Sequence, residues 1–328
     1  MKIESGMRHI DKISSISGGS QDDIFIACAS FEDRCLGSMQ KFNNYKPKKI
    51  VIFEFEENNP AREKNLIELE NIIDRTGLRN SYKKLSVTHG MTTNGILNLH
   101  NYFKENNLSN SKNLSITLDI TTFTKELLLE VLFYLTNIVK FQKMRILYTI
   151  PSKYASPEEG PLSYGISNIK IVPFFWNNWT ATKDDLLMVI LGYEEMRAWS
   201  LISRFDANGN RLFITKPGSK PEWDMHCENY NKRLLKENFE RAEMPSMDPL
   251  SVAKILEEQI ARENLYNKYN IFIAPLGTKP QILGVFCFLT NNPEIRANIV
   301  STTAIDHNFP YYSSGIGDTF YTMIQNQN

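Results

Sequence analysis

The sequence predicts an α/β protein with two tandem Rossmann-like domains, each built on a mostly parallel sheet and related by an internal duplication. Three observations support this fold class. Short apolar segments alternate with longer amphipathic segments, which is the pattern of strands joined by helices. The chain has 328 residues, which at about 100–200 residues per domain indicates two domains. After an aromatic-rich segment near the middle, the alternation begins again.

The first half contains five expected strands with helices between them. The strands are expected at 24–30, 50–55, 85–88, 114–120 and 144–149, and the helices at 35–42, 60–75, 93–105 and 125–140. Pro60 suits the first turn of a helix, because an N–H at that position has no acceptor within the helix. Strands that are separated by helices form a parallel sheet covered on both faces.

The second half repeats this alternation. Strands are expected at 186–192, 212–215, 269–274 and 298–301, and helices from residue 193, over 224–237 and 249–265, and from 280 to about 289. Residues 311–318, rich in tyrosine and glycine, are expected to form a loop at the mouth of the second domain.

These patterns set the predicted domain boundaries. Residues 1–20 are polar and are expected to form a flexible N-terminal arm. The first domain is expected at 21–172, a linker at 173–184 and the second domain at 185–328. The linker is rich in aromatic residues, from Phe174 to Trp179, which predicts that it packs on the protein.

The charge balance argues against a broad basic face. The chain has 37 basic and 37 acidic residues, whereas binding along DNA, RNA or an anionic membrane needs a local surplus of positive charge. No apolar run approaches the roughly 18–20 residues that span a bilayer, and no secretory signal is visible. We therefore expect a cytoplasmic protein without membrane contact or bulk nucleic-acid binding. The oligomeric state stays open, a homodimer included.

Cysteine and histidine spacing predicts no metal site. The four cysteines form no C-x-x-C pair, and the five histidines are scattered along the chain. Because a zinc site needs several ligands at short, regular spacing, we expect neither a metal nor a cofactor.

Two motifs recur in the same order in both halves. Residues 26–34 and 189–197 both read as a strand, an aromatic residue, a glutamate, a second acid and an arginine. Residues 118–125 and 273–279 both read as a strand, a small polar loop and Thr-Lys before an apolar helix. A shorter echo joins 163–166 to 314–316. The shared order predicts that one segment was duplicated.

The recurring motifs lie where open α/β sheets bind ligands. Small molecules bind outside the carboxyl ends of the strands, at the point where the strand order reverses. Helices that begin there present backbone N–H groups and a partial positive charge, which suits phosphate. Lys125 and Lys279 would each add a positive charge at such a helix start. Facing half-sites would form one pocket for an anion.

Residues 274–288, a strand end followed by Gly-Thr-Lys-Pro and an apolar helix, resemble the motif of CRISPR-associated Rossmann fold (CARF) domains, and residues 119–125 resemble a looser form of it. CARF domains pair about a two-fold axis and hold a cyclic oligoadenylate over that axis. The related SAVED domains fuse two CARF-like halves in one chain. The resemblance implies a cytoplasmic sensor of a nucleotide or cyclic oligonucleotide in bacterial antiviral defence, with a separate effector protein as partner. The implied ligand-binding residues are Ser30, Glu32, Arg34, Thr124, Lys125, Glu194, Arg197, Gly277, Thr278 and Lys279.

Two other functions remain open at this point. The first is a Rossmann-like enzyme that cleaves or modifies a nucleotide, with acid–base work by Glu32, Asp33, Glu194 or His307. The second is a scaffold subunit of a defence complex whose pocket is vestigial. The acids also have a purely structural explanation, because acidic residues stabilise helix N-termini and can pair with the neighbouring arginines.

Overall fold

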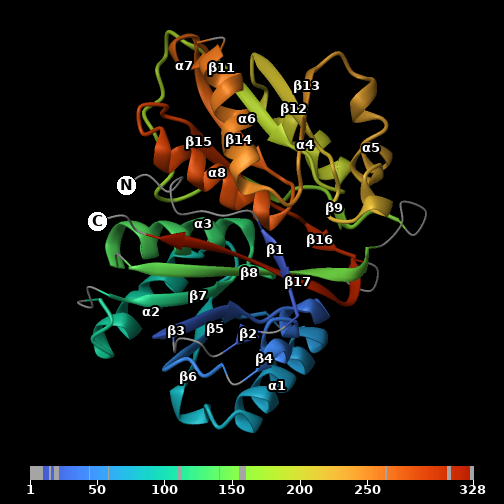
Figure 1. The fold of residues 1–328 in the computed structure, drawn as a ribbon. Coiled ribbons are helices and arrows are strands. Elements are labelled where there is room, and N and C mark those ends of the chain that lie inside the picture. The colour runs from blue at the N-terminus through green and yellow to red at the C-terminus, as the bar shows by residue number, and fades with distance from the viewer. Residues whose placement is uncertain are drawn as a thin grey trace. The chain divides into compact units, whose positions relative to one another are not determined.

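A computed structural model shows the chain as two compact units (Figure 1). It describes residues 10–14, 16–17, 22–43, 45–57, 59–109, 113–139, 141–154, 160–262, 264–308 and 312–325. Unit 1 consists of residues 1–154 and 313–328, and unit 2 of residues 155–312. The predicted α/β class is confirmed, because each unit is built on a mixed, mostly parallel sheet.

Unit 1 has a seven-stranded sheet in the order β1-β17-β8-β7-β3-β5-β6. Its parallel strands are β3 (Ile24–Cys28), β5 (Ile50–Phe55), β6 (Tyr82–Val87), β7 (Ser115–Asp119) and β8 (Lys143–Tyr154). β17 (Ser313–Gln325) runs antiparallel to β8, and β1 (Asp11–Ile13) runs antiparallel to β17. All residues of β3 are buried, which explains why this central strand is a continuous apolar run.

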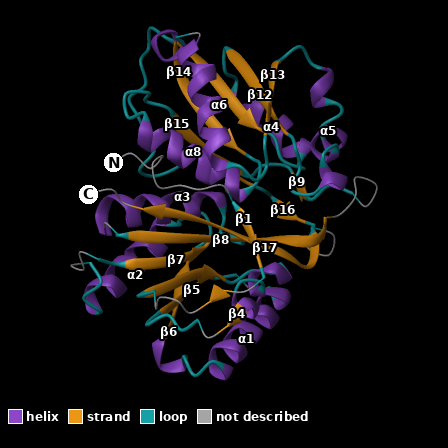
Figure 2. Ribbon diagram, in the orientation of Figure 1, coloured by secondary structure: helices purple, strands orange, loops and turns teal. Residues whose placement is uncertain are grey.

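Helices cover both faces of this sheet (Figure 2). On one face lie η1 (Asp33–Leu36) and α1 (Pro60–Arg75), whose apolar residues share a core cluster with β3 and β5. On the other face lie α2 (Thr93–Glu105) and α3 (Lys125–Phe133), and α3 continues into a π-helical turn, η4 (Tyr134–Val139).

The helix expected over 35–42 is wrong. The segment forms two short 3-10 turns, η1 and η2 (Met39–Lys41), followed by the two-residue strand β4 (Phe42–Asn43). Close packing against β8 accounts for the compact turn, because a Cβ atom at Gly37 would lie 2.5 Å from the Thr149 side chain.

Unit 2 has a six-stranded sheet in the order β10-β15-β14-β11-β12-β13. Its parallel strands are β11 (Asp184–Ile190), β12 (Gly209–Thr215), β13 (Glu240–Met244), β14 (Tyr269–Pro275) and β15 (Asn298–Thr303), and β10 (Asn168–Ile171) runs antiparallel to β15. The helices are α4 (Glu195–Phe205), α5 (His226–Tyr230), α6 (Pro249–Arg262), α7 (Leu265–Lys268) and α8 (Lys279–Asn291). A separate short pair joins β9 (Ser163–Tyr164) to β16 (Asp306–His307).

Two details of unit 2 differ from the sequence prediction. β13 is a strand that the periodicity does not reveal, because its sequence Glu-Arg-Ala-Glu-Met is charged and mostly exposed at the sheet edge. The long helix expected over 224–237 is only α5 with the 3-10 turns η6 (Pro221–Trp223) and η7 (Leu234–Lys236) beside it.

The two units share one strand order. When the five parallel strands of each unit are numbered along the chain, both sheets have the order 3-2-1-4-5. Each sheet also has one antiparallel strand beside its fifth parallel strand. These antiparallel strands are exchanged: β10 follows β8 in the chain but pairs with β15, whereas β17 follows β15 but pairs with β8.

This exchange moves the domain boundaries away from the predicted ones. The residues expected to form a loop at 311–318 include the start of β17, which belongs to the sheet of unit 1 and not to the second domain. The expected linker at 173–184 lies inside unit 2. Phe175 in that segment is buried, whereas Trp176 and Trp179 are 76% and 56% exposed.

The predicted N-terminal arm is partly ordered. Within this arm, residues 1–9, 15 and 18–20 lie outside the described residues. Within the described part, β1 pairs with β17, and β2 (Ile16–Ser17) pairs with β4. These strands attach the N-terminal segment to unit 1.

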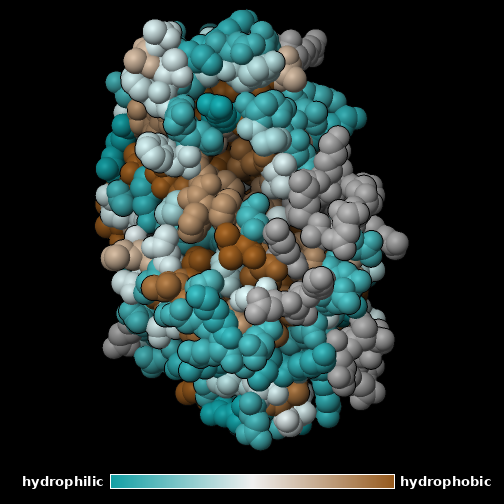
Figure 3. All heavy atoms as spheres, turned by 90° about the vertical axis from the view of Figure 1, so that its left-hand side faces the viewer, coloured by the Kyte–Doolittle hydropathy of each residue, from teal (hydrophilic) through white to brown (hydrophobic). Residues whose placement is uncertain are grey.

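Among the described residues, none of the helices combines the length and apolar character that a membrane span requires. The visible face in Figure 3 carries hydrophobic residues among hydrophilic ones.

A chain that ends at Tyr312 tests the exchange of strands. It lacks β17, so β8 becomes an exposed sheet edge and unit 1 should lose stability, while unit 2 keeps all of its strands. Hydrogen exchange should accelerate in β7 and β8, by about tenfold for each 1.4 kcal/mol of opening free energy lost, and stay unchanged in β11 and β14. Loss of protection in unit 2 with unit 1 intact, as the predicted boundaries imply, would contradict this topology.

Candidate functional site

The strand order places the predicted site residues at the switch point of each sheet. In unit 1 the order reverses between β3 and β7, and in unit 2 between β11 and β14. Residues 30–34 follow β3, and residues 124–125 follow β7. Residues 193–197 follow β11, and residues 277–279 follow β14. Each unit therefore brings its own two motifs to one edge of its sheet.

The two threonines of the Thr-Lys motifs are helix N-caps. The Thr124 hydroxyl accepts a hydrogen bond from the Leu127 N–H at 3.3 Å. Thr278 forms a capping box with Gln281, whose Oε1 accepts from the Thr278 N–H at 2.8 Å. The Thr278 hydroxyl also donates to the Ser246 carbonyl at 2.6 Å. The Thr278 proton is thus engaged within the protein, and its role in the described conformation is to start α8.

Lys125 and Lys279 each occupy the first position of a helix, α3 and α8 respectively. Both side chains are half-buried. A glycine precedes the second motif for a steric reason, because a Cβ atom at Gly277 would lie 1.9 Å from Gln281 Oε1.

In unit 1, Glu32 and Arg34 form a buried ion pair. Arg34 Nε and Nη2 donate to the two Glu32 carboxylate oxygens at 2.9 Å each, and the two side chains are 5% and 7% exposed for arginine and glutamate. Arg34 Nη1 lies 3.4 Å from the Thr149 carbonyl of β8, and the Ser313 hydroxyl donates to Glu32 at 2.6 Å. Burial opposes the charge on Arg34, yet Glu32 raises the guanidinium pKa well above its ordinary value. The Arg34 guanidinium is therefore positively charged.

Unit 2 contains the same arrangement. The Ser163 hydroxyl donates to Glu194 at 2.5 Å, and Arg197 Nη1 lies 3.3 and 3.4 Å from the two Glu194 oxygens. Arg197 Nε donates to the Thr302 hydroxyl at 2.7 Å, and Nη2 donates to the Thr302 carbonyl of β15. In both units, the arginine thus joins the loop after the first parallel strand to the fifth parallel strand.

We call each set a Ser–Glu–Arg clamp: Ser313, Glu32 and Arg34 in unit 1, and Ser163, Glu194 and Arg197 in unit 2. Each clamp serine begins the sequence Ser-x-Gly-Ile: Ser313 is the first residue of the exchanged strand β17, and Ser163 lies in β9, shortly before the exchanged strand β10. Gly315 and Gly165 both have positive φ, 69° and 52°, a conformation that side chains disfavour. The glutamate and the arginine of each clamp belong to the motifs that recur in the sequence, whereas the serine contacts required the structure.

The clamps change the expected role of the acidic residues. Glu32 and Glu194 are held by arginine and serine, so neither is placed to exchange a proton with a ligand. Asp33 is exposed and accepts a long hydrogen bond, 3.4 Å, from the Gly315 N–H.

The His307 side chain lies outside the described residues. In the described part of the chain, no three residues among His, Cys, Asp and Glu are grouped to hold a metal ion.

Asp119 is a buried carboxylate that the sequence analysis did not single out. It ends β7, is 2% exposed, and accepts hydrogen bonds from the Ser38 hydroxyl and from both N–H and hydroxyl of Thr121. Burial raises the pKa of Asp119 despite these donors. Since the Thr121 hydroxyl also accepts from the Thr149 N–H at 2.9 Å, the cluster connects the carboxyl ends of β7 and β8.

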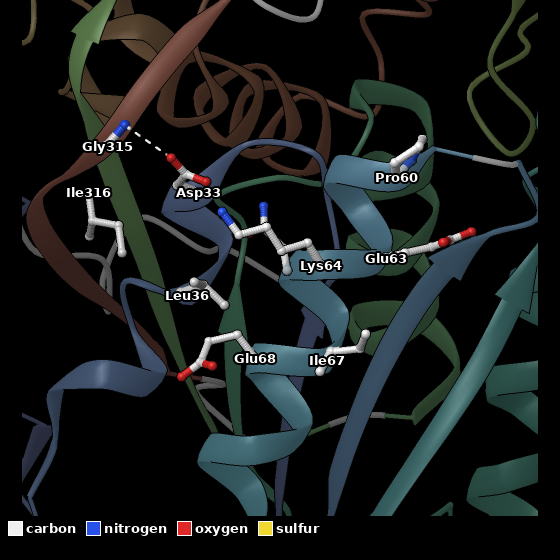
Figure 4. Close-up of a pocket in the computed structure, with 10 residues that line it drawn as sticks. Asp33, Leu36, Pro60, Glu63, Lys64, Ile67, Glu68, Gly315 and Ile316 are labelled. Atoms are coloured by element: carbon white, nitrogen blue, oxygen red, sulfur yellow. Dashed lines mark hydrogen bonds between the residues drawn. The ribbon is translucent and has the colours of Figure 1, made fainter.

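A pocket of about 750 Å³ lies in unit 1 between η1, α1 and β17 (Figure 4). Its walls include apolar side chains from all three elements, and its charged residues are three acids and one lysine. The lining residues are Asp33, Leu36, Pro60, Glu63, Lys64, Asn65, Ile67, Glu68, Gly315 and Ile316. Neither Thr124 nor Lys125 lines it, so this pocket is not the predicted anion site.

No protein-family model and no curated protein matches this chain.

The Glu32→Gln substitution tests the clamp of unit 1. It leaves the Arg34 charge buried without a carboxylate, so unit 1 should lose about 3–5 kcal/mol of unfolding free energy. The loss should be smaller for Glu194→Gln, because the Arg197 side chain is more exposed, at 12%. Urea unfolding with a probe in each unit measures both effects.

Arg75→Ala is the matched control. The Arg75–Glu68 pair is exposed, with side chains 67% and 41% accessible, so its loss should cost about 1 kcal/mol or less. Equal effects of Glu32→Gln and Arg75→Ala would show that the buried pair does not stabilise unit 1.

Proposed function

We propose that this protein binds nucleotides, cyclic oligonucleotides among them, at the carboxyl edge of each sheet and acts as a sensor that does not turn the ligand over. The observation that carries the proposal is the matched placement of the Thr-Lys motifs. In both units, a long helix begins at the switch point with a capping threonine followed by a lysine.

Electrostatics supports an anionic ligand at these edges. The N-terminus of a helix carries a partial positive charge and favours phosphate, and Lys125 and Lys279 add a full charge at each helix start. Glu32 and Glu194 are acids of the recurring motifs, and each is paired with its arginine. Their negative charge is therefore balanced within the protein and does not oppose a phosphate.

The resemblance to CARF and SAVED domains supports the same ligand class. Those families bind cyclic oligoadenylates, and SAVED domains contain two CARF-like halves in one chain. The common 3-2-1-4-5 strand order, the two clamps and the Ser-x-Gly-Ile segments support our inference that the halves arose by duplication. On this proposal, the protein works in the cytoplasm in antiviral defence and passes the signal to a separate effector protein.

Sensing is favoured over catalysis because the candidate acids are engaged. An acid–base catalyst needs a carboxyl group that reaches the reacting atoms and changes protonation during the cycle. Glu32 and Glu194 instead hold ionised arginines at buried positions. Asp33 is exposed and lines the pocket of unit 1, which neither Thr124 nor Lys125 lines.

The Lys125→Ala, Lys279→Ala double variant tests the proposed site. A nucleotide panel that includes linear and cyclic oligonucleotides is added to the protein, and thermal unfolding is recorded. A ligand at 100 times its Kd should stabilise the wild type by about 2.7 kcal/mol. The double variant should fold normally and lose this stabilisation, because both positive charges at the helix starts are removed.

The control is Lys104→Ala with Lys254→Ala. Lys104 lies in the last turn of α2 and Lys254 is exposed on α6, away from any helix start. The control variant should respond to ligand like the wild type. A double variant at Lys125 and Lys279 that still responds fully would refute the assignment. Chromatography of the same samples detects turnover, which would favour an enzyme, and no response to any nucleotide would favour a scaffold.

A further inference from the structure

Arg62 is a buried arginine whose side chain is 7% exposed. Among the described residues, its buried Nε–H has no hydrogen-bond acceptor. Among the described residues, the guanidinium group donates no hydrogen bond, and its nearest carboxylate is Glu57, with Nη1 and Oε2 3.9 Å apart. That distance is too long for a hydrogen bond.

This arrangement is costly unless an acceptor is supplied from outside the chain. Arginine stays protonated in proteins and carries five N–H donors, so it cannot lower the cost by losing its charge. Buried polar groups in folded proteins are nearly always hydrogen-bonded, and a charged one most of all. A buried guanidinium whose Nε–H has no acceptor among the described residues therefore indicates an oxygen-bearing ligand.

The position of Arg62 indicates what that ligand is. Arg62 lies in the first turn of α1, a 16-residue helix capped by Asn59, whose side chain accepts from the Arg62 N–H at 3.1 Å. One turn later, Asn65 Nδ2 donates to the Ser30 carbonyl at 3.0 Å, which fixes this end of α1 against the loop after β3. The guanidinium thus combines with a helix N-terminus at the carboxyl edge of the central strands, where the helix dipole favours an anion.

We propose that Arg62 and the N-terminal turn of α1 bind one phosphate group. The guanidinium presents parallel N–H donors that match two oxygens of a phosphate, and the ligand would supply the acceptor that Nε–H lacks. Only the identity of the molecule that carries the phosphate rests on the proposed function. If that molecule is the proposed nucleotide, the subsite holds one of its phosphates at the edge of unit 1.

The neighbouring charged groups affect the affinity of this subsite for phosphate. Glu57 and Glu63 flank Arg62 in the sequence, and Glu57 Oε1 lies 3.7 Å from His89 Nδ1. Glu57 is 46% exposed, so its carboxylate competes with the phosphate for Arg62 but is free to turn toward solvent. Removal of that negative charge should strengthen phosphate binding, which gives a variant with the opposite expected effect.

The test uses pyrophosphate as the probe, at constant ionic strength set with sodium chloride. The arginine Nε–H resonances of the full-length protein are recorded by NMR, and the Arg62 signal is identified by its loss in Arg62→Lys. Pyrophosphate should shift this signal. Binding should weaken about 10- to 100-fold in Arg62→Gln, as expected for lost hydrogen bonds to a charged group, and tighten in Glu57→Gln. Arg75→Gln, at the exposed far end of the same helix, should bind like the wild type.

Each outcome decides the proposal. An Arg62 signal that pyrophosphate leaves unchanged, or equal binding by the wild type and Arg62→Gln, would overturn it. If Arg62→Gln does not fold, the proposal is tested by the pyrophosphate-induced shift in the wild type and by pyrophosphate binding to Arg62→Lys. Arg62→Lys should bind pyrophosphate more weakly, because lysine keeps the positive charge but lacks the planar guanidinium with its parallel N–H donors. Pyrophosphate binding at Arg62 without any response to the nucleotide panel would leave this subsite standing and refute the nucleotide proposal. If the wild type and Arg62→Gln respond equally to nucleotides, the nucleotide proposal stands and the Arg62 subsite is refuted.

Discussion

The buried glutamate–arginine pair is the interaction on which each unit depends. An arginine this deeply buried needs a carboxylate beside it, and the remaining N–H groups need further acceptors. In unit 1 these requirements bring three distant parts of the chain together: the loop after β3, the carbonyl of Thr149 in β8, and Ser313 at the start of β17. Unit 2 meets the same requirements with Glu194, Thr302 and Ser163. The clamps thereby fix the edge of each sheet at which a ligand would bind.

Because the antiparallel strands are exchanged, the two clamps differ in how far apart their glutamate and serine lie along the chain. Glu32 and Ser313 are 281 positions apart, whereas Glu194 and Ser163 are only 31 apart. Unit 2 is thus continuous in the chain, but unit 1 is complete only when the C-terminal segment joins it. Closing the longer loop has a larger entropic cost and slows the formation of long-range pairs. We therefore expect unit 2 to form before unit 1.

Charge at the carboxyl edges is arranged in two ways. Glu32 and Glu194 are each paired with an arginine of their own motif, and these pairs stabilise the fold. Arg62 differs, because among the described residues its nearest carboxylate is that of Glu57, 3.9 Å away, and its Nε–H has no hydrogen-bond partner. Most buried arginines are tightly paired, which is why we propose a phosphate ligand for Arg62.

The sequence by itself determined the central strands and the helix starts. β3, β5, β7, β11 and β14 are apolar runs buried on both faces, and Pro60, Thr124 and Thr278 begin helices because local backbone chemistry suits those positions. The recurrence of Glu32 with Arg34 and of Glu194 with Arg197 was also visible in the sequence.

Only the tertiary structure decided which segments pair. The charged edge strand β13 has no apolar periodicity that would reveal it as a strand. The sequence of β17 does not indicate which of the two sheets the strand joins. Arg62 gave no sequence signal at all, because its significance lies in burial without an acceptor. Strand exchange and unsatisfied burial are properties of contacts between residues far apart in the chain, and local sequence patterns do not record such contacts.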